Sequence, residues 1–230
     1  LVSLRPISQE CMKVSPSRAQ WTDQQREAGP HLKIENLSRE YTTRHGNWQK
    51  HSKVIRAVNN FNLEIAVGES FGLVGESGCG KTTLLMLAAG LEKTSAGQVI
   101  YNEQSVHLID VKRYIGISSD KIMLPDFLTS QQLLKFHCAQ HKCLFPHDLI
   151  KHLGFITQLT TQVSSLSLGN LKKVSLLLAF AHHPKLLLLD EPTTGLDHNS
   201  RTWLFNYLDN YQGQIIVTSH EESFTENLHY

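Results

Sequence analysis

Residues 75–83 read Gly-Glu-Ser-Gly-Cys-Gly-Lys-Thr-Thr, and this stretch decides the fold. Its three glycines leave the backbone free to wrap around an anion with the N–H groups pointing inward. Lys81 supplies a positive charge for the β- and γ-phosphates of a nucleotide, and Thr82 supplies a hydroxyl group for Mg²⁺. The spacing therefore predicts a phosphate-binding loop.

The segments on either side of the loop support this prediction. Residues 70–74 read as a short buried strand, and residues 82–91 read as an apolar helix. A bound phosphate would lie at the helix N-terminus, where the helix dipole and the free N–H groups favour negative charge. We expect the whole loop to line the nucleotide site: Gly75, Glu76, Ser77, Gly78, Cys79, Gly80, Lys81, Thr82 and Thr83.

A second motif, at residues 186–191, reads Leu-Leu-Leu-Leu-Asp-Glu. Four leucines followed by two acids predict a parallel strand buried on both faces, with carboxylates at its C-terminal end. Open α/β sheets bind their ligands at that end. Asp190 is therefore a candidate ligand for Mg²⁺, and Glu191 is a candidate catalytic base that polarises an attacking water.

Three further stretches follow the phosphate loop. Residues 166–170 read Leu-Ser-Leu-Gly-Asn, residues 192–197 read Pro-Thr-Thr-Gly-Leu-Asp, and residues 215–220 read Ile-Ile-Val-Thr-Ser-His. With these stretches the chain resembles the ATP-binding cassette (ABC) ATPases over about residues 32–220. The resemblance implies an α/β fold of the P-loop NTPase type, with a mixed sheet core, an antiparallel β layer and a helical subdomain. It also implies ATP and Mg²⁺ as cofactors.

The resemblance assigns roles to four more residues. Ser167 and Gly169 match the signature loop, which contacts the γ-phosphate of ATP held by a second ATPase subunit. His220 matches the histidine that works with the catalytic glutamate. Tyr41 matches the aromatic residue that stacks on adenine. The alternatives are that Tyr41 is an ordinary core tyrosine and that His220 is an ordinary surface histidine.

The chain departs from the family pattern at three places. In the signature, Leu168 replaces a glycine and Asn170 replaces a glutamine. Asp120 stands where the family has a glutamine that contacts Mg²⁺ and the permease, so we expect Asp120 to approach the metal. Residues 221–230 are a short end for this family, which predicts either a compact variant or a truncated chain.

The expected domain organisation is simple. Residues 1–30 predict a poorly ordered N-terminal extension, and residues 31–230 predict the ATPase domain. Its helical subdomain is expected at about residues 125–182, and residues 42–53 are a polar excursion between two strands.

Composition limits the classes of partner. The 230 residues include 22 Lys and Arg against 21 Asp and Glu, without a basic run that would indicate nucleic acid binding. No apolar stretch approaches the roughly 18 residues that span a bilayer. For a chain of this composition, the resemblance to ABC ATPases implies a peripheral subunit on the cytoplasmic face of the cell membrane, held there by a separate transmembrane permease.

The direction of transport is left open by the motifs. The phosphate-loop half is similar to the ATPases of peptide and nickel importers, which favours import of a peptide, metal or metal chelate, with a possible solute-binding protein. The Ser-Leu-Gly signature and Asp120 are more similar to drug or ion exporters. A third alternative is an ABC ATPase of DNA repair or translation that transports nothing. The second ATPase subunit can be identical or different.

One further cluster of residues offers metal ligands. Residues 137–143 read His-Cys-Ala-Gln-His-Lys-Cys, and His147 follows. Histidine and cysteine are ligands that transition metals prefer, and His137 and His141 are one helical turn apart. The interpretation we favour is an amphipathic helix whose histidines face solvent.

Overall fold

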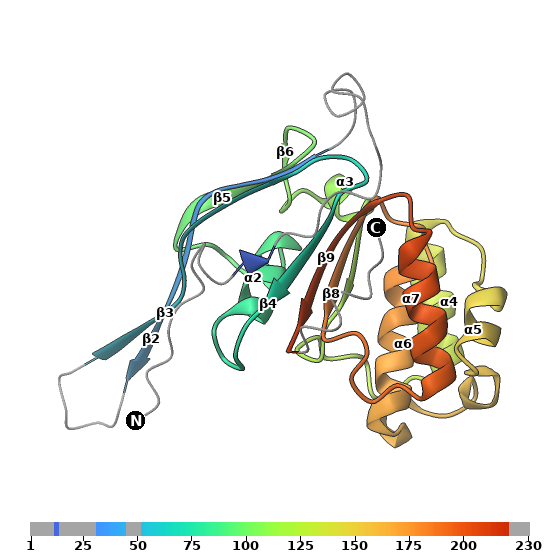
Figure 1. Cartoon of the computed structure of the whole chain (residues 1–230). Helices are drawn as coiled ribbons and strands as arrows, with labels where there is room; N and C mark the ends of the chain where they lie inside the picture. The colour runs from blue at the N-terminus through green and yellow to red at the C-terminus, as the bar shows by residue number, and fades with distance from the viewer. Residues whose placement is uncertain (1–11, 14–30, 45–51, 221–230) are drawn as a thin grey trace.

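The computed structural model describes residues 12–13, 31–44 and 52–220. Within these residues the strands form one largely parallel sheet and one antiparallel sheet, and the longer helices gather on one side (Figure 1). The prediction of a P-loop NTPase-type α/β fold with an antiparallel layer is confirmed.

The parallel sheet carries the residues of the predicted site. Its strand order is β1-β4-β9-β8-β7, and β4, β9, β8 and β7 run parallel while β1 is antiparallel to β4. The strands are β1 (Met12–Lys13), β4 (Ser70–Val74), β7 (Ile115–Ser118), β8 (Leu186–Asp190) and β9 (Gln214–Ser219). Because β4 and β8 both flank β9, the phosphate loop and the two acids emerge at the same edge of the sheet.

The antiparallel sheet has the order β3-β2-β5-β6. Its strands are β2 (Leu32–Arg44), β3 (Ser52–Ile65), β5 (Ala96–Tyr101) and β6 (Gln104–Ser105). The β2–β3 ribbon reaches beyond the rest of the sheet (Figure 1). Pairing continues to Arg44 opposite Ser52, so the strands extend into residues that the sequence predicts to be an irregular polar excursion.

The helices start at recognisable capping residues. In α4 (Ser130–His141) the Thr129 side chain caps the N-terminus together with Gln132, and in α6 (Leu168–Phe180) Ser167 is the cap. Asp197 caps α7 (His198–Asp209). The other helices are α2 (Lys81–Ala88), α3 (Ile109–Lys112), α5 (His147–His152), and the 3₁₀ turns η2 (Ile156–Gln158) and η3 (Val163–Ser165).

Alternate leucines of β8 enter two different hydrophobic cores. Leu186 and Leu188 join the core that packs against α2 and the antiparallel sheet. Leu187 and Leu189 join the core formed with α4, α6 and α7. All four side chains are fully buried, as expected for a central strand covered on both faces.

Two residues of the N-terminal extension belong to the parallel sheet. The sequence predicts a poorly ordered extension over residues 1–30, yet Met12 and Lys13 pair with Leu73 and Gly72 at the edge of this sheet. The rest of the predicted N-terminal extension, residues 1–11 and 14–30, lies outside the described residues. The short C-terminal end, residues 221–230, lies outside them as well.

We predict that Leu188→Ala lowers the free energy of unfolding by about 2–5 kcal/mol, because it leaves a cavity in a core that cannot collapse. Leu144→Ala is the matched control, since Leu144 is 90% exposed and Leu188 is fully buried. Urea denaturation of both variants measures the difference. An equal effect of the two substitutions would contradict the assignment of β8 as the central strand.

Candidate nucleotide site

The phosphate loop joins β4 to α2 with the backbone geometry that its glycines permit. Gly78 and Gly80 adopt φ angles of 82° and 103°, in the left-handed region that side chains disfavour. The first backbone hydrogen bond into α2 runs from Leu84 N to Gly80 O at 2.9 Å. The preceding N–H groups of α2 remain free for an anion, as at the start of any helix.

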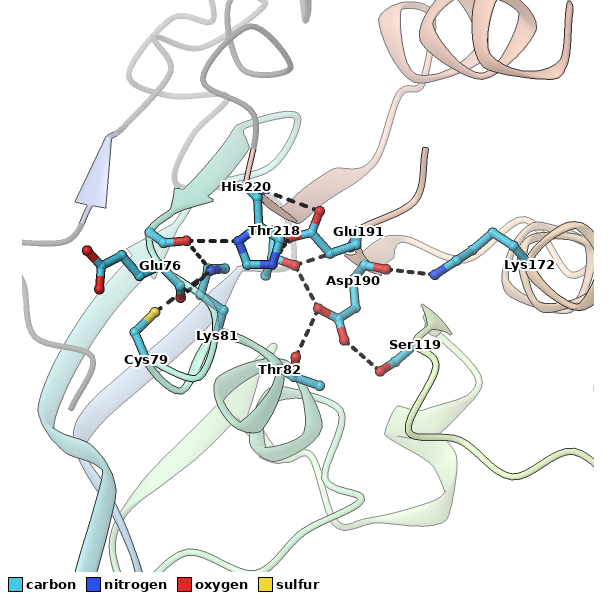
Figure 2. Close-up of polar contacts among 11 residues, drawn as sticks. Glu76, Cys79, Lys81, Thr82, Ser119, Lys172, Asp190, Glu191, Thr218 and His220 are labelled. Atoms are coloured by element: carbon cyan, nitrogen blue, oxygen red, sulfur yellow. Dashed lines mark hydrogen bonds and ion pairs between the residues drawn. The ribbon is translucent and has the colours of Figure 1, made fainter. Parts of the chain in front are cut away.

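Lys81 is a buried cation at the centre of this loop. Lys81 is only 5% exposed. Its Nζ donates to the carbonyl oxygens of Gly75 and Glu76, the latter at 2.9 Å. The Cys79 sulfur lies 3.8 Å from the same nitrogen (Figure 2). These carbonyl partners are neutral, so the ammonium group makes no hydrogen bond to a negatively charged group.

Asp190, at the C-terminal end of β8, is a buried anion on the opposite side of the site. Asp190 is 7% exposed and accepts hydrogen bonds from three hydroxyl groups. Thr82 and Thr218 donate to Oδ1 at 3.1 and 2.7 Å, and Ser119 donates to Oδ2 at 2.8 Å (Figure 2). The carboxylate thus links α2, β9 and the segment after β7, again through neutral partners.

Glu191 follows Asp190 with an unusual backbone conformation. Its φ angle is 46°, in the left-handed region that is unfavourable for a side chain with a Cβ. The backbone N–H of Glu191 donates to the carbonyl oxygen of Thr218 at 3.2 Å. This turn directs Glu191 away from the line of β8 and towards His220, which lies after β9 (Figure 2).

His220 connects Glu191 to the phosphate loop. Its Nδ1 lies 3.2 Å from the carbonyl oxygen of Gly75, which can only accept, so Nδ1 carries a proton. Its Nε2 lies 3.1 Å from Oε1 of Glu191. The backbone N–H of His220 donates a hydrogen bond to the other carboxyl oxygen, Oε2, at 3.3 Å. Burial raises the pKa of Glu191, although the nearby His220 and Lys81 oppose this effect.

These groups surround one cavity of about 340 Å³, whose lining includes Lys81, Asp190, Glu191 and His220. The remaining lining residues are Ile55, Arg56, Ala57, Ser77, Gly78, Gly80, Thr82, Thr83 and Lys121. A phosphate would compensate the charge of Lys81, and a divalent cation would compensate that of Asp190. Carboxylate and hydroxyl oxygens suit Mg²⁺, so the residues fit a nucleotide with its metal.

Sequence reasoning missed several residues that line this cavity or contact Asp190. Ser119 and Thr218 support Asp190, and residues 55–57 of β3 line the cavity. Thr218 lies in the stretch that carries the family resemblance, so its place at the end of β9 opposite Asp190 was a usable signal. Nothing in the sequence distinguishes Ser119, because its role depends on β7 lying beside β8.

Tyr41 is placed apart from the cavity. It lies on β2 opposite Ile55, and its hydroxyl donates to Glu92 Oε2 at 2.6 Å. The Arg39 guanidinium lies 4.5 Å from the centre of its ring. The structure thus does not bring Tyr41 together with the phosphate loop, whereas its neighbour Ile55 does line the cavity.

Asp120 pairs with a lysine and lies outside the lining of the cavity that contains Lys81. Its Oδ1 pairs at 2.6 Å with Nζ of Lys172, which is 3% exposed, and that nitrogen also donates to the backbone oxygen of Asp190 at 3.1 Å. Asp120 lines a separate cavity of about 770 Å³, beside Leu168. Ser119, one residue earlier, is the residue of this segment that contacts the Asp190 carboxylate.

The signature residues lie at the start of α6. The Ser167 hydroxyl accepts from Asn170 N at 3.3 Å, so it caps the helix. Gly169 is needed for close packing, since a Cβ there would lie 2.4 Å from the carbonyl oxygen of Gly195. Leu168 is 84% exposed. These residues lie outside the lining of the cavity that contains Lys81.

We predict that Asp120→Asn lowers the free energy of unfolding by about 1–2 kcal/mol. The substitution removes the charge that compensates buried Lys172, an effect reduced by the exposure of Asp120 to solvent. Urea denaturation should be compared with that of Asp126→Asn, which changes an exposed carboxylate of the same segment. Identical stabilities of the two variants would show that the ion pair is not stabilising.

None of the helices in the described residues is sufficiently long and apolar to cross a bilayer.

Comparison with known proteins agrees with this geometry. The family model described as "ABC transporter" matches residues 58–194. The mouse (Mus musculus) glucosylceramide transporter ABCA12 is 32% identical over 190 residues, covering 77% of this chain but only 7% of that protein. The ABC transporter ATP-binding protein NatA of Bacillus subtilis is 31% identical over 185 residues, covering 75% of each chain.

A solved structure gives the same fold. The dimeric post-hydrolysis state of an ATP-binding cassette bound to ADP and phosphate matches with a TM-score of 0.71 at 22% identity, over 85% of this chain and 90% of that one. The family model and the similarity to NatA together show that the chain belongs to the ABC transporter family, as an ATP-binding ATPase domain.

Proposed function

We propose that this chain binds and hydrolyses ATP with Mg²⁺ and thereby powers an ABC transporter whose substrate passes through a separate permease. The observation that carries this proposal is the pair of buried, oppositely charged groups at one cavity. Lys81 has neutral carbonyl partners and Asp190 has neutral hydroxyl partners. Mg²⁺·ATP would supply a directly bound partner of opposite charge for each group.

Binding of the nucleotide uses the loop residues in distinct roles. Lys81 exchanges its carbonyl partners for oxygens of the β- and γ-phosphates, and the open N–H groups of the loop and of α2 bind the remaining oxygens. Thr82 and Asp190 hold Mg²⁺, with Ser119 and Thr218 orienting the carboxylate. When bound, Mg²⁺ neutralises negative charge on the phosphates.

Glu191 and His220 carry the proton chemistry. Glu191 accepts a proton from the attacking water, because burial raises its pKa towards the range in which a carboxylate is an effective base. His220 orients Glu191 through the contact of 3.1 Å and fixes it relative to the phosphate loop through the Gly75 carbonyl. The strained backbone at Glu191 holds the carboxyl group in this direction.

A second ATPase subunit, identical or different, completes the proposed site. The resemblance assigns Ser167 and Gly169 to a nucleotide held by another subunit, and their place outside the lining of the Lys81 cavity supports this role. Exposed apolar side chains near the signature support such a contact: Leu168 is 84% exposed, Phe127 is 72% exposed and Met123 is 95% exposed. In the same proposal Tyr41 stacks on adenine, which requires it to leave Glu92.

Asp120 has a conditional role in the proposal. For it to approach Mg²⁺, the ion pair with Lys172 must open, and opening would also change the contact between Lys172 and the backbone of Asp190. Such a change would transmit the state of the nucleotide to α6 and to a permease.

We infer a peripheral position on the cytoplasmic face of the membrane, with residues 31–230 as the ATPase domain and about residues 125–182 as its helical subdomain. The phosphate-loop sequence favours import of a peptide, metal or metal chelate, with a solute-binding protein. The Ser-Leu-Gly signature and Asp120 are more similar to the second candidate, an exporter of drugs or ions. Uptake and efflux measured in vesicles containing the permease separate the two.

We predict that Lys81→Ala weakens binding of Mg²⁺·ATP about 10- to 100-fold, since charge-assisted contacts contribute about 1.5–3 kcal/mol. Isothermal titration calorimetry measures the affinity. Lys93→Ala, at an exposed lysine beyond α2, is the control for the change in net charge and should bind normally. Unchanged affinity of Lys81→Ala would exclude the loop as the phosphate site.

We predict that Glu191→Gln binds ATP normally but lowers its turnover about 10²- to 10⁴-fold, because glutamine keeps the shape of the side chain and cannot accept the proton. Release of phosphate measures turnover, and sizing in the presence of ATP measures the dimer, which should persist. Glu103→Gln, on the exposed turn between β5 and β6, should remain active. Full activity of Glu191→Gln would rule out Glu191 as the base.

A further inference from the structure

Three histidines that the nucleotide site does not use come together between α4 and the end of α6. His137 and His141 are on α4, and His182 follows α6. One nitrogen from each ring lies within 4.8 Å of the others, and in residues 12–13, 31–44 and 52–220 this is the only such group of metal-binding side chains. The histidine-rich stretch of α4 therefore gains a third member from a distant part of the sequence.

The sequence prediction that the histidines of α4 face solvent is wrong. His137 and His141 are half-buried, and their rings lie 4.3 Å apart. The rings of His141 and His182 are 4.0 Å apart. The other residues considered as ligands lie elsewhere: His147 is exposed, and Cys143 interacts with Cys138.

The hydrogen bonds fix the tautomers of two of the three rings. His182 Nε2 lies 3.2 Å from the carbonyl oxygen of Ile115, so Nε2 carries the proton and Nδ1 has a lone pair. That Nδ1 lies 3.1 Å from Nε2 of His137. The Nδ1 atom of His141 is buried and has no hydrogen-bond partner among the described residues. A histidine that binds a metal through one ring nitrogen usually donates a hydrogen bond from the other, often to a backbone carbonyl, and this bond fixes the orientation of the ring.

We propose that His137, His141 and His182 bind one divalent transition-metal ion, Zn²⁺, at the wall of the cavity between α4, α6 and β7. The three rings line this cavity of about 450 Å³, which leaves a fourth coordination position for water. Three imidazole nitrogens suit Zn²⁺ and do not suit Mg²⁺ or Ca²⁺, which prefer oxygen. The site is separate from the cavity that contains Lys81 and Asp190.

Two features of the metal-free arrangement must change on binding. The proton between His137 and His182 must move to Nδ1 of His137, a tautomer exchange that leaves the net charge unchanged. The ring of His141, now stacked on His182, must turn so that a nitrogen converges on the ion. His141 is the last residue of α4, where helix contacts restrict a side chain least. Arg113 also lines the cavity and opposes a cation, but its guanidinium pairs with Asp110 at 3.8 Å.

The proposal is tested by adding Zn²⁺ and, separately, Co²⁺ to the full chain after removal of metals, without nucleotide because ATP binds these ions. We expect one Zn²⁺ per chain by calorimetry, a rise in the melting temperature, and the strong visible absorption of tetrahedral Co²⁺ without a thiolate band. His182→Gln and His141→Gln should each weaken Zn²⁺ binding more than the roughly 10- to 100-fold that loss of an outer-sphere partner causes.

His147→Gln is the matched control, since it removes an exposed histidine that begins α5 and lies outside the cluster. It should bind Zn²⁺ as the unmodified chain does. His141→Gln keeps the experiment informative if His182→Gln fails to fold, because circular dichroism of each variant reports its folding separately. Absence of stoichiometric Zn²⁺ binding, or equal binding by His141→Gln and His147→Gln, would overturn the proposal.

Discussion

The carboxylate of Asp190 is the group on which the rest of the site depends. It accepts hydrogen bonds from Thr82 at the start of α2, Thr218 at the end of β9 and Ser119 after β7. Each donor belongs to a different segment, and only the parallel sheet brings them to one edge. A carboxylate that is 7% exposed is costly to bury, and three neutral donors offset this cost only in part. The fold therefore buries a carboxylate whose negative charge a metal ion would compensate.

The same strand end also connects the site to the helices. The buried ammonium group of Lys172, on α6, donates to the backbone oxygen of Asp190 and also pairs with the carboxylate of Asp120. A rearrangement at Asp190 would therefore reach α6 through one hydrogen bond. The resemblance to the family places a neutral glutamine at the position of Asp120, and in this chain the acid pairs with buried Lys172.

Much of this arrangement follows from local sequence. The loop at residues 75–83 and the strand Leu186–Asp190 are encoded by glycine spacing and by a leucine run, which tertiary context cannot easily override. The contacts that depend on neighbouring strands were not predictable in this way. Ser119 contacts Asp190 only because β7 lies beside β8, and His182 joins the α4 histidines only because α6 ends there. The length of the β2–β3 ribbon was missed because its outer residues are polar.

The most direct test of the central claim is a crystal structure of the chain with Mn²⁺ in place of Mg²⁺ and a non-hydrolysable ATP analogue, in which anomalous scattering locates the metal. The account predicts Mn²⁺ between the Thr82 hydroxyl and the Asp190 carboxylate. It also predicts that Lys81 Nζ leaves the Gly75 carbonyl and contacts the phosphates. A metal bound away from Asp190, or a nucleotide bound while Lys81 keeps its carbonyl partners, would contradict the account.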